Sequence, residues 1–382
     1  MINIGLIISP FLTEELIKEE LIEIQDNNKL LEEINKKYQI SNNGKIYTTN
    51  EIIIVNYIRN TYEDVNVNII DPLEINSVGE NDIIFLLTFD IIEAFHTLPY
   101  YKYKEYANYL MKQKNIYPHY DFQKLINFKD SYFNHLIKNN INVLDFFIIK
   151  KNDDYKKKIN ELFDYKDKVG WGNFIIKPLY GQEGIGFKAF NENASSYLVE
   201  KDIEHLIKMG FPGVIFQEEL RNYDTNSEFR TYFINGEYIY TVETGDHVME
   251  LVNTHNNKAN TKITKIIKFA QRVVNSLPHV IINNVKLPHL LIRVDIGYDN
   301  DNNLFVNEIE FVPSLYTNFI HKKKMAELNL HELLGDTIYE ITAKYVNNRS
   351  ILYDNKPNAH MFNIIIINIF IILIVLFFLY TH

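Results

Sequence analysis

The segment LLIRVDIGYDNDNNLFVNEIEFVP, residues 290–313, is the strongest constraint on the fold of this chain. Two apolar runs are separated by a cluster of Asp and Asn, a pattern typical of a β-hairpin. Side chains two positions apart on a strand face the same side, so Arg293 shares a face with Asp295, and Glu308 with Glu310. By the same alternation, residues 307 and 309 face away. The sequence therefore predicts three carboxylates and one arginine side by side on adjacent strands.

This acidic face has two interpretations. Clustered carboxylates repel one another and have raised pKa values unless a cation lies among them, and Mg²⁺ prefers oxygen ligands of this kind. Asp295, Glu308 and Glu310 would then form a metal site suited to nucleotide phosphates, with Mn²⁺ as an alternative ion. The other interpretation is an amphipathic hairpin whose charged face is only solvated. The hairpin alone does not choose between them.

A second segment, NFIIKPLYGQEGIGF at 173–187, ends an apolar run in Lys177 and continues with Gly181, Gly184 and Gly186. A buried strand that delivers a lysine to a loop of bare backbone N–H groups is a way to hold phosphate. The alternative is a tight connection between two strands, which also needs glycine.

Composition limits the classes of function. The 382 residues suffice for two or three domains, and 46% are hydrophobic, which excludes a disordered chain. The net charge of −10 argues against a nucleic-acid partner. The sequence contains no cysteine, so thiolate catalysis and Cys-ligated zinc are excluded, and any metal is expected to be a hard ion held by oxygen.

The C-terminal residues 362–380, FNIIIINIFIILIVLFFLY, contain no charge. As a helix they would extend roughly 28 Å, about the thickness of a bilayer core. We therefore expect a single-pass tail anchor, with a buried C-terminal helix as the alternative. Arg349 and Lys356 precede the run, which favours a catalytic domain on the cytoplasmic side of a membrane.

Between these features, apolar periodicity alternates between strands and helices. Strands are predicted at 3–9, 65–71, 82–89, 143–149, 174–177 and 213–220 and in a hairpin at 228–244, and helices at 14–38, 50–62, from Lys129 onward, 153–168, 260–276 and 322–347. Strands and helices that alternate at the start of the chain predict an open α/β domain with a mainly parallel sheet.

The order of the motifs resembles the ATP-grasp superfamily of carboxylate–amine ligases, which includes D-alanine–D-alanine ligases, glutathione synthetases and ribosomal-protein glutamate ligases. A lysine on a strand and a glycine loop are followed by QEEL, EFR, RVD and NEIE within residues 115–320. The resemblance implies an N-terminal open α/β domain followed by an ATP-grasp fold of two α+β subdomains. The implied divisions are 1–120, 121–215, 216–348, a linker at 349–361 and the transmembrane tail at 362–380.

The resemblance also implies how ATP is bound. Two lysines contact the phosphates, a glycine flap closes over them, a hinge strand contacts adenine through its backbone, and an acid followed by an arginine lies at the ribose. The implied residues, in that order, are Lys129, Lys177, Gly181, Gly184, Gly186, Gln217, Glu218, Glu219, Leu220, Glu228 and Arg230. From the sequence pattern alone, Lys129 is an ordinary surface lysine.

The metal ligands that the resemblance implies are Asp295, Glu308 and Glu310, and the implied catalytic residues are Arg293 and Lys177. Glu310 departs from the family, which usually has Asn there. Pro313–Ser314 stands where the family has Pro-Gly, which puts a standard substrate loop in doubt.

Three functions remain open at this stage. The first is an ATP- and Mg²⁺-dependent ligase that joins a small-molecule or peptide carboxylate to an amine through an acyl phosphate. The second is a kinase that phosphorylates a hydroxyl, like the inositol-phosphate kinases of the superfamily. The third is a catalytically silent, membrane-tethered nucleotide-binding module. His247, His255 and the basic run 321–324 receive no role, because solvated loop residues explain them equally well.

Overall fold

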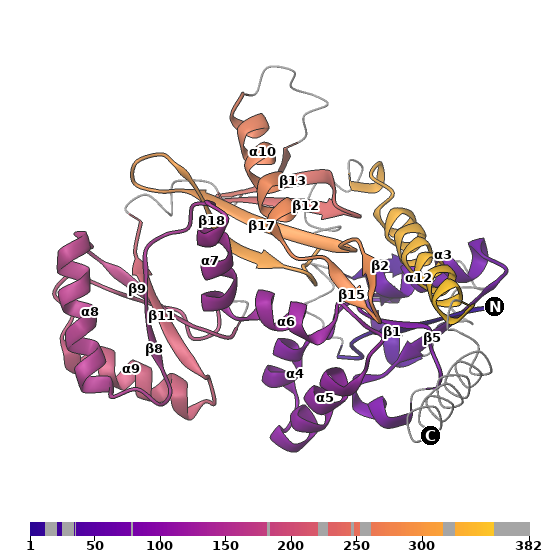
Figure 1. Cartoon of the computed structure of the whole chain (residues 1–382), viewed down its shortest axis with the longest axis horizontal. Coiled ribbons are helices and arrows are strands. Elements are labelled where there is room, and N and C mark those ends of the chain that lie inside the picture. The colour runs from indigo at the N-terminus through magenta and orange to yellow at the C-terminus, as the bar shows by residue number, and fades with distance from the viewer. Residues whose placement is uncertain are drawn as a thin grey trace, which may run out of the picture.

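The computed structural model describes residues 1–11, 21–24, 34, 36–77, 79–181, 184–220, 228–245, 248–252, 261–315 and 325–354. These residues form an N-terminal sheet, a small middle sheet and a larger C-terminal sheet, each with its own helices (Figure 1).

The N-terminal unit is an open parallel sheet with the strand order β5-β1-β6-β7. Its strands are β1 (Ile2–Ile7), β5 (Val65–Ile70), β6 (Ile83–Leu86) and β7 (Ile116–Tyr117), and its helices are α3 (Asn50–Thr61), α4 (Ile91–Thr97) and α5 (Tyr100–Lys112). Helix α3 begins where the Thr49 side chain accepts a hydrogen bond from the Ile52 amide. The predicted open α/β domain with a mainly parallel sheet is confirmed.

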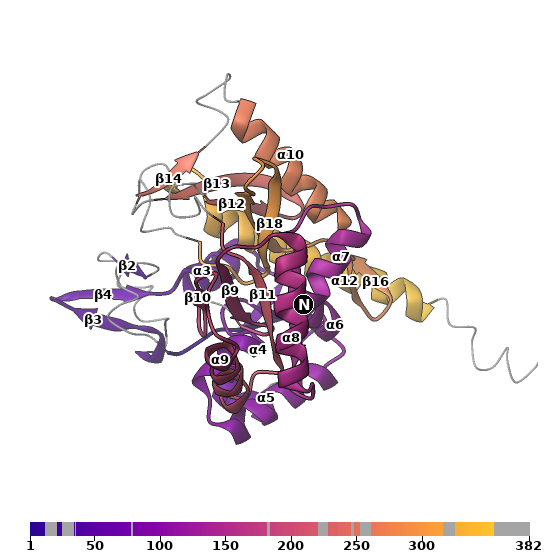
Figure 2. The same cartoon turned by 90° about the vertical axis from the view of Figure 1, so that its left-hand side faces the viewer.

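One predicted element in this unit is wrong. Within the helix expected at 14–38, Ile22–Ile24 is strand β2, and Lys36–Tyr38 is a short 3₁₀ turn, η1. Strand β2 pairs antiparallel with β4 (Lys45–Thr48), which also pairs with β3 (Ile40–Asn42), and this small sheet projects from the molecule in Figure 2. Leu21 and Ile24 are buried three residues apart, a spacing that also fits a helix. Pairing with a distant strand decided the outcome, which local spacing does not encode.

The middle unit is an antiparallel sheet with the order β10-β9-β11-β8. It contains β8 (Phe146–Lys150), β9 (Phe174–Pro178), β10 (Lys188–Phe190) and β11 (Gly213–Glu218), with helices α8 (Tyr155–Val169) and α9 (Ser196–Lys208) packed on it. Leu162, Phe174 and Phe216 belong to a hydrophobic core whose buried members all lie in this unit, and Phe95 of α4 packs against it from the N-terminal unit. Residues 146–218 are called the small-sheet unit below.

The C-terminal unit is a five-stranded antiparallel sheet with the order β14-β13-β12-β17-β18. Its strands are β12 (Glu228–Ile234), β13 (Glu237–Gly245), β14 (Val248–Val252), β17 (Leu291–Tyr298) and β18 (Leu304–Glu310), and its helix is α10 (Thr261–Ser276). The hairpin of β15 (Val280–Ile282) and β16 (Val285–Leu287) lies beside this sheet. Helices α6 (Tyr120–Asn127) and α7 (Lys129–Lys138) come before it in the chain. Both predicted hairpins are confirmed. Asn235 and Gly236 close the first one with φ values of 54° and 79°, the left-handed conformations that a tight hairpin turn needs.

Helix α12 (Leu330–Asp354) joins the C-terminal sheet to the N-terminal unit. It contacts α3 and β1 on one side and β12 and β16 on the other. A single hydrophobic core therefore runs through both units. The helix continues past its predicted end, residue 347, to Asp354, and so into the stretch predicted as a linker.

Across the described parts of the chain, no helix combines the length and apolarity needed to cross a bilayer. The predicted anchor, residues 362–380, lies outside the described residues.

Candidate active site

A cavity of about 930 Å³ lies where the three units meet. The five-stranded sheet contributes charged residues, the small-sheet unit contributes Lys177 and glycines, and the N-terminal unit contributes a polar wall. Residues from the three sources include Arg230, Arg293, Asp295, Glu308 and Glu310, then Ile175, Lys177, Gly181, Gly184 and Glu218, and Ser9, Asn50, Glu51, Thr88 and Glu93.

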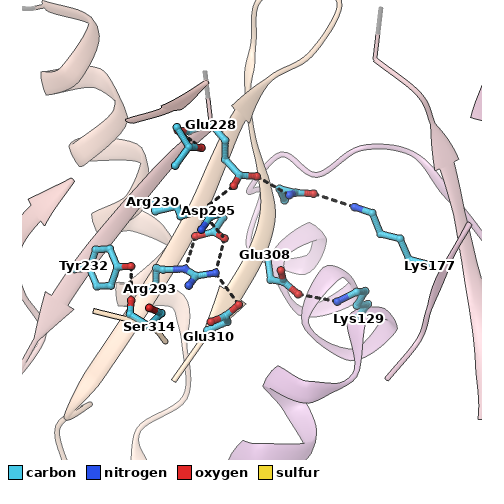
Figure 3. Close-up of polar contacts among 12 residues, drawn as sticks. Lys129, Lys177, Glu228, Arg230, Tyr232, Arg293, Asp295, Glu308, Glu310 and Ser314 are labelled. Atoms are coloured by element: carbon cyan, nitrogen blue, oxygen red, sulfur yellow. Dashed lines mark hydrogen bonds and ion pairs between the residues drawn. The ribbon is translucent and has the colours of Figure 1, made fainter. Parts of the chain in front are cut away.

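The hairpin β17–β18 places its charged residues as the sequence predicts. Arg293 lies opposite Glu310, and Asp295 lies opposite Glu308, in the antiparallel register. Asp295, Glu308 and Glu310 each have an oxygen within 4.8 Å of the other two, so the three offer a compact set of hard donors (Figure 3). Such a set fits Mg²⁺, which takes carboxylate oxygens as ligands.

The alternative of a solvated acidic face is wrong. Asp295 is 2% exposed, Arg293 5% and Glu310 8%. The Arg293 guanidinium donates from Nε to Asp295 Oδ1 and from Nη2 to Asp295 Oδ2, both at 2.8 Å, and from Nη2 to Glu310 Oε1 at 2.6 Å. These charges are buried because they are paired with one another.

The three acids differ in their pKa values, although burial acts to raise all of them. It raises the pKa of Asp295 to about 6 and that of Glu310 to about 8, although the Arg293 charge acts in the opposite direction. Burial also disfavours the charged form of Glu308, but the Lys129 ammonium, together with the charges of Arg293 and Lys177, outweighs burial and lowers the pKa of Glu308. A divalent cation at this site would stabilise the charged forms of the two carboxyls whose pKa values are raised.

Lys129 is buried, so its interpretation as an ordinary surface lysine is wrong. It opens α7, and its Nζ donates to Glu308 Oε1 at 2.7 Å and to the Gly181 carbonyl at 2.9 Å. The Lys129 amide also donates to the Leu179 carbonyl at 2.9 Å. The start of α7 is thereby tied both to the carboxylates and to the glycine segment.

Lys177 lies near the end of β9 and faces Glu228 across the cavity in Figure 3. Burial, followed by the nearby Lys129 charge, lowers the pKa of Lys177 to about 8. Two lysine side chains held at one edge of a cavity offer donors that suit the phosphates of a nucleotide.

The glycine segment does join two paired strands, as the structural alternative requires, because β10 pairs antiparallel with β9. It also lines the cavity at Gly181 and Gly184. Gly184 and Gly186 have φ values of 68° and 74°, and a Cβ on Gly186 would lie 2.6 Å from Leu206 Cδ2. Residues 182 and 183 lie outside the described ranges.

The predicted adenine hinge lies at the end of β11. Glu218, Glu219 and Leu220 line the cavity. Gln217 does not line it, but it is buried and pairs with Ile175, which does. The Oε1 atom of Gln217 has no hydrogen-bond partner among the described residues.

Glu228 and Arg230 project from β12 into the same cavity. Arg230 Nε donates to Glu228 Oε1 at 3.1 Å and lies 3.9 Å from Asp295 Oδ2. The predicted ribose acid is thereby linked to the predicted metal site.

The expectation that residue 307 faces away from the site is wrong. Asn307 lines the cavity, where its amide accepts a hydrogen bond from Lys177 Nζ at 3.2 Å and donates to Glu228 Oε2 at 2.8 Å. The pairing shifts from Asp295 opposite Glu308 to Ile296 opposite Val306, so Asn307 is the extra residue of a β-bulge. A bulge breaks the two-residue alternation on which the expectation rested. Ile309 is buried in the core, as expected.

The polar wall of the N-terminal unit is also absent from the sequence prediction. Ser9 follows β1, and Thr88 and Asp90 follow β6. Ligands of open parallel sheets bind at the carboxyl ends of the strands, and this rule could have identified them.

The segment after β18 is held by buried tyrosines. The hydroxyl of Tyr232 donates to the Ser314 carbonyl at 2.7 Å, and that of Tyr240 to the Leu315 carbonyl at 3.0 Å. His247, His255 and 321–324 lie outside the described residues.

Comparisons with known proteins bear on the fold. No protein-family model matches the sequence, and no curated protein matches it. Solved structures do: the D-cycloserine synthetase DcsG is similar over 89% of this chain and 99% of its own, with 12% identity and a TM-score of 0.59. A D-alanine–D-alanine ligase from Bacillus anthracis is similar over 91% of this chain and 100% of its own, with 13% identity and a TM-score of 0.56. At this identity the likeness shows the fold alone, which this chain shares with the D-cycloserine synthetase and the D-alanine–D-alanine ligase.

Proposed function

We propose that the chain is an ATP- and Mg²⁺-dependent ligase that joins a carboxylate to an amine. The observation that carries the proposal is that Lys129, Lys177, Arg293 and a three-carboxylate donor set share one cavity. A second structure of the D-alanine–D-alanine ligase from Bacillus anthracis, solved in complex with ATP, is similar over 90% of this chain with a TM-score of 0.54.

The chemistry divides into two steps. A substrate carboxylate oxygen attacks the γ-phosphorus of ATP, the bond to the β-phosphate oxygen breaks, and ADP leaves with an acyl phosphate formed. The amine nitrogen then attacks the acyl carbon, inorganic phosphate leaves, and the nitrogen loses a proton to give the amide. Arg293 and the two lysines stabilise the negative charge that develops on the transferred oxygens.

Asp295, Glu308 and Glu310 would hold the magnesium. When bound, Mg²⁺ neutralises phosphate charge and orients the phosphates for transfer. Lys129 now bonds to Glu308, so we expect ATP to draw this lysine toward its phosphates and free Glu308 as a ligand. Nucleotide and metal should accordingly bind together better than either binds alone.

The wall of the N-terminal unit supports an amine substrate. Glu51, Asp90 and Glu93 line the cavity there, and none of the described lining residues of this unit is Lys, Arg or His. A cationic amine suits such a wall, whereas a polyphosphorylated inositol would be repelled. This balance favours the ligase over the kinase.

The test is a turnover assay of the full chain with Mg²⁺, ATP and pools of amino acids, short peptides and polyamines. We expect ADP release that depends on the acid, and formation of a hydroxamate when hydroxylamine replaces the amine. ADP release without any hydroxamate, together with a phosphorylated hydroxyl, would establish the kinase instead. Nucleotide binding without turnover of any substrate in the pools would leave the silent nucleotide-binding module.

We also propose, from the sequence, that residues 362–380 anchor the enzyme in a membrane with its catalytic units on the cytoplasmic side. Because α12 continues to Asp354 and Arg349 lies 3.6 Å from Asp82, a truncation should follow Asp354. The full chain should float with liposomes, and residues 1–354 should stay in solution and bind ATP. Equal flotation of both would refute the anchor.

A further inference from the structure

Asn307 connects the two sides of the cavity. Its amide lies between Lys177, which belongs to the small-sheet unit, and Glu228, which belongs to the five-stranded sheet. Figure 3 shows Lys177 and Glu228 facing each other across this gap. The sequence resemblance assigns a role to both of these residues but none to Asn307.

An amide is the group that this position requires. Its carbonyl oxygen accepts from the ammonium, while its NH₂ group donates to the carboxylate, so one planar group satisfies both neighbours. A carboxylate in its place would oppose Glu228, and an apolar side chain would bond to neither. Because the amide is neutral, it also orients Lys177 without neutralising the charge that phosphate needs.

The backbone is built to deliver this side chain. The bulge at Asn307 allows both Asn307 and Glu308 to line the cavity, which regular alternation forbids. Tyr132, fully buried beneath the site, has its hydroxyl 3.4 Å from the Asn307 carbonyl. The Val306 amide donates to the Asn142 carbonyl at 3.0 Å. Contacts on both sides of the bulge therefore fix its position.

We propose that Asn307 is a positioning residue for ATP, which holds the phosphate-binding Lys177 and the ribose-side Glu228 in fixed relative positions before the nucleotide enters. The inference rests on the proposed function. It predicts that the loss of the amide weakens nucleotide binding through Lys177, although Asn307 carries no charge.

The test is titration calorimetry of the full chain with Mg·ADP, which binds without reacting. Asn307→Leu should weaken affinity about tenfold, the scale of one or two lost hydrogen bonds to charged groups. Asn307→Asp keeps the shape but opposes Glu228, and should weaken it similarly, while Asn307→Gln keeps the amide and should lose less. Asn108→Leu, an exposed site on α5, is the matched control and should bind normally.

A double-mutant cycle separates positioning from a general structural effect. If Asn307 acts through Lys177, then Asn307→Leu should cost little more once Lys177 is Met. Additive losses, or normal binding by both Asn307→Leu and Asn307→Asp, would overturn the inference. If Lys177→Met weakens binding while the Asn307 variants do not, only this inference fails. If the wild type does not bind Mg·ADP, the proposed function fails with it.

Discussion

The two sides of the cavity differ in how they are anchored. The carboxylates and Arg293 lie on a sheet whose core is continuous with that of the N-terminal unit. Lys177 and the glycines lie on the small-sheet unit, whose core is largely separate. Of its buried residues, Leu179, Tyr180 and Ile215 join the larger core, and half-buried Phe146 and Ile148 pack against it. Units with separate cores can shift relative to each other at small cost. The side that carries the carboxylates is therefore fixed, while the side that carries Lys177 can shift relative to it.

Polar contacts across the cavity reinforce this difference. Within the described residues, Arg293 pairs with acids of its own hairpin. In contrast, Lys177 reaches across to Asn307, and Lys129 of α7 bonds both to Glu308 and to Gly181 of the small-sheet unit. These crossing bonds occupy groups that a nucleotide and its metal would use. Nucleotide binding should exchange these bonds for bonds to phosphate.

The largest expected effect comes from the fixed side. Glu308→Gln keeps the shape but removes one charge from the metal set and from the ion pair with Lys129. Turnover should fall by at least about a hundredfold, comparable to the loss of one main electrostatic stabiliser. Glu237→Gln, an exposed change on the same sheet, should turn over normally. Wild-type turnover by Glu308→Gln would show that the hairpin is not the metal site.

A substitution on the small-sheet side of the cavity should act mainly on nucleotide affinity. Lys177→Ala removes an ammonium from the phosphate path, so the affinity for Mg·ATP should fall by about 1–3 kcal/mol, the scale of a charge-assisted hydrogen bond. Lys157→Ala on α8 of the same unit removes an exposed lysine and serves as the control. Calorimetry measures both. Unchanged affinity in Lys177→Ala would remove its phosphate assignment.

Two glycines test the backbone of the adjustable side. Gly184 and Gly186 both have positive φ, but a Cβ on Gly184 meets nothing within 4 Å, whereas one on Gly186 lies 2.6 Å from Leu206 and 2.9 Å from Pro178. Gly184→Ala should cost about 1–2 kcal/mol of stability from its backbone conformation, and Gly186→Ala about 1–3 kcal/mol more from overpacking. Urea denaturation measures the two. Equal losses would argue against the close packing at Gly186.

The smallest effect concerns pH. Burial raises the pKa of Glu310 from 4.5 to about 8, so between these values the unfolded chain releases a proton that the folded chain keeps. The stability of the metal-free protein should therefore fall as pH rises through this window. Glu310→Asn removes this contribution, and the melting temperature should decline less between pH 5 and 8. Part of the pH dependence should remain in Glu310→Asn, because burial also raises the pKa of Asp295, to about 6.

Glu310→Asn should also keep substantial activity, because an Asn carbonyl still offers an oxygen to Arg293 and to a metal. Melting curves in EDTA and turnover at neutral pH check the two halves of this prediction. An unchanged slope would mean that Glu310 is ionised in the folded protein throughout the window.

Sequence periodicity alone determined most of the elements and one face of the site. The parallel N-terminal sheet, both hairpins and the shared face of Arg293, Asp295 and Glu310 follow from spacings of two and of three to four residues. These patterns are local, because a strand or helix repeats its side-chain directions over a few residues. The motif order then carried the resemblance to the ATP-grasp ligases.

Only the tertiary structure decided what depends on distant partners. The strand at Ile22–Ile24 exists because Lys45–Thr48 lies beside it. Lys129 is buried because Glu308 of β18 and Gly181 of the small-sheet unit contact it. Asn307 entered the cavity through a bulge, a single extra residue that shifts pairing without altering composition. Burial, register and cross-unit hydrogen bonds are set by the whole packed chain, and a local pattern does not contain them.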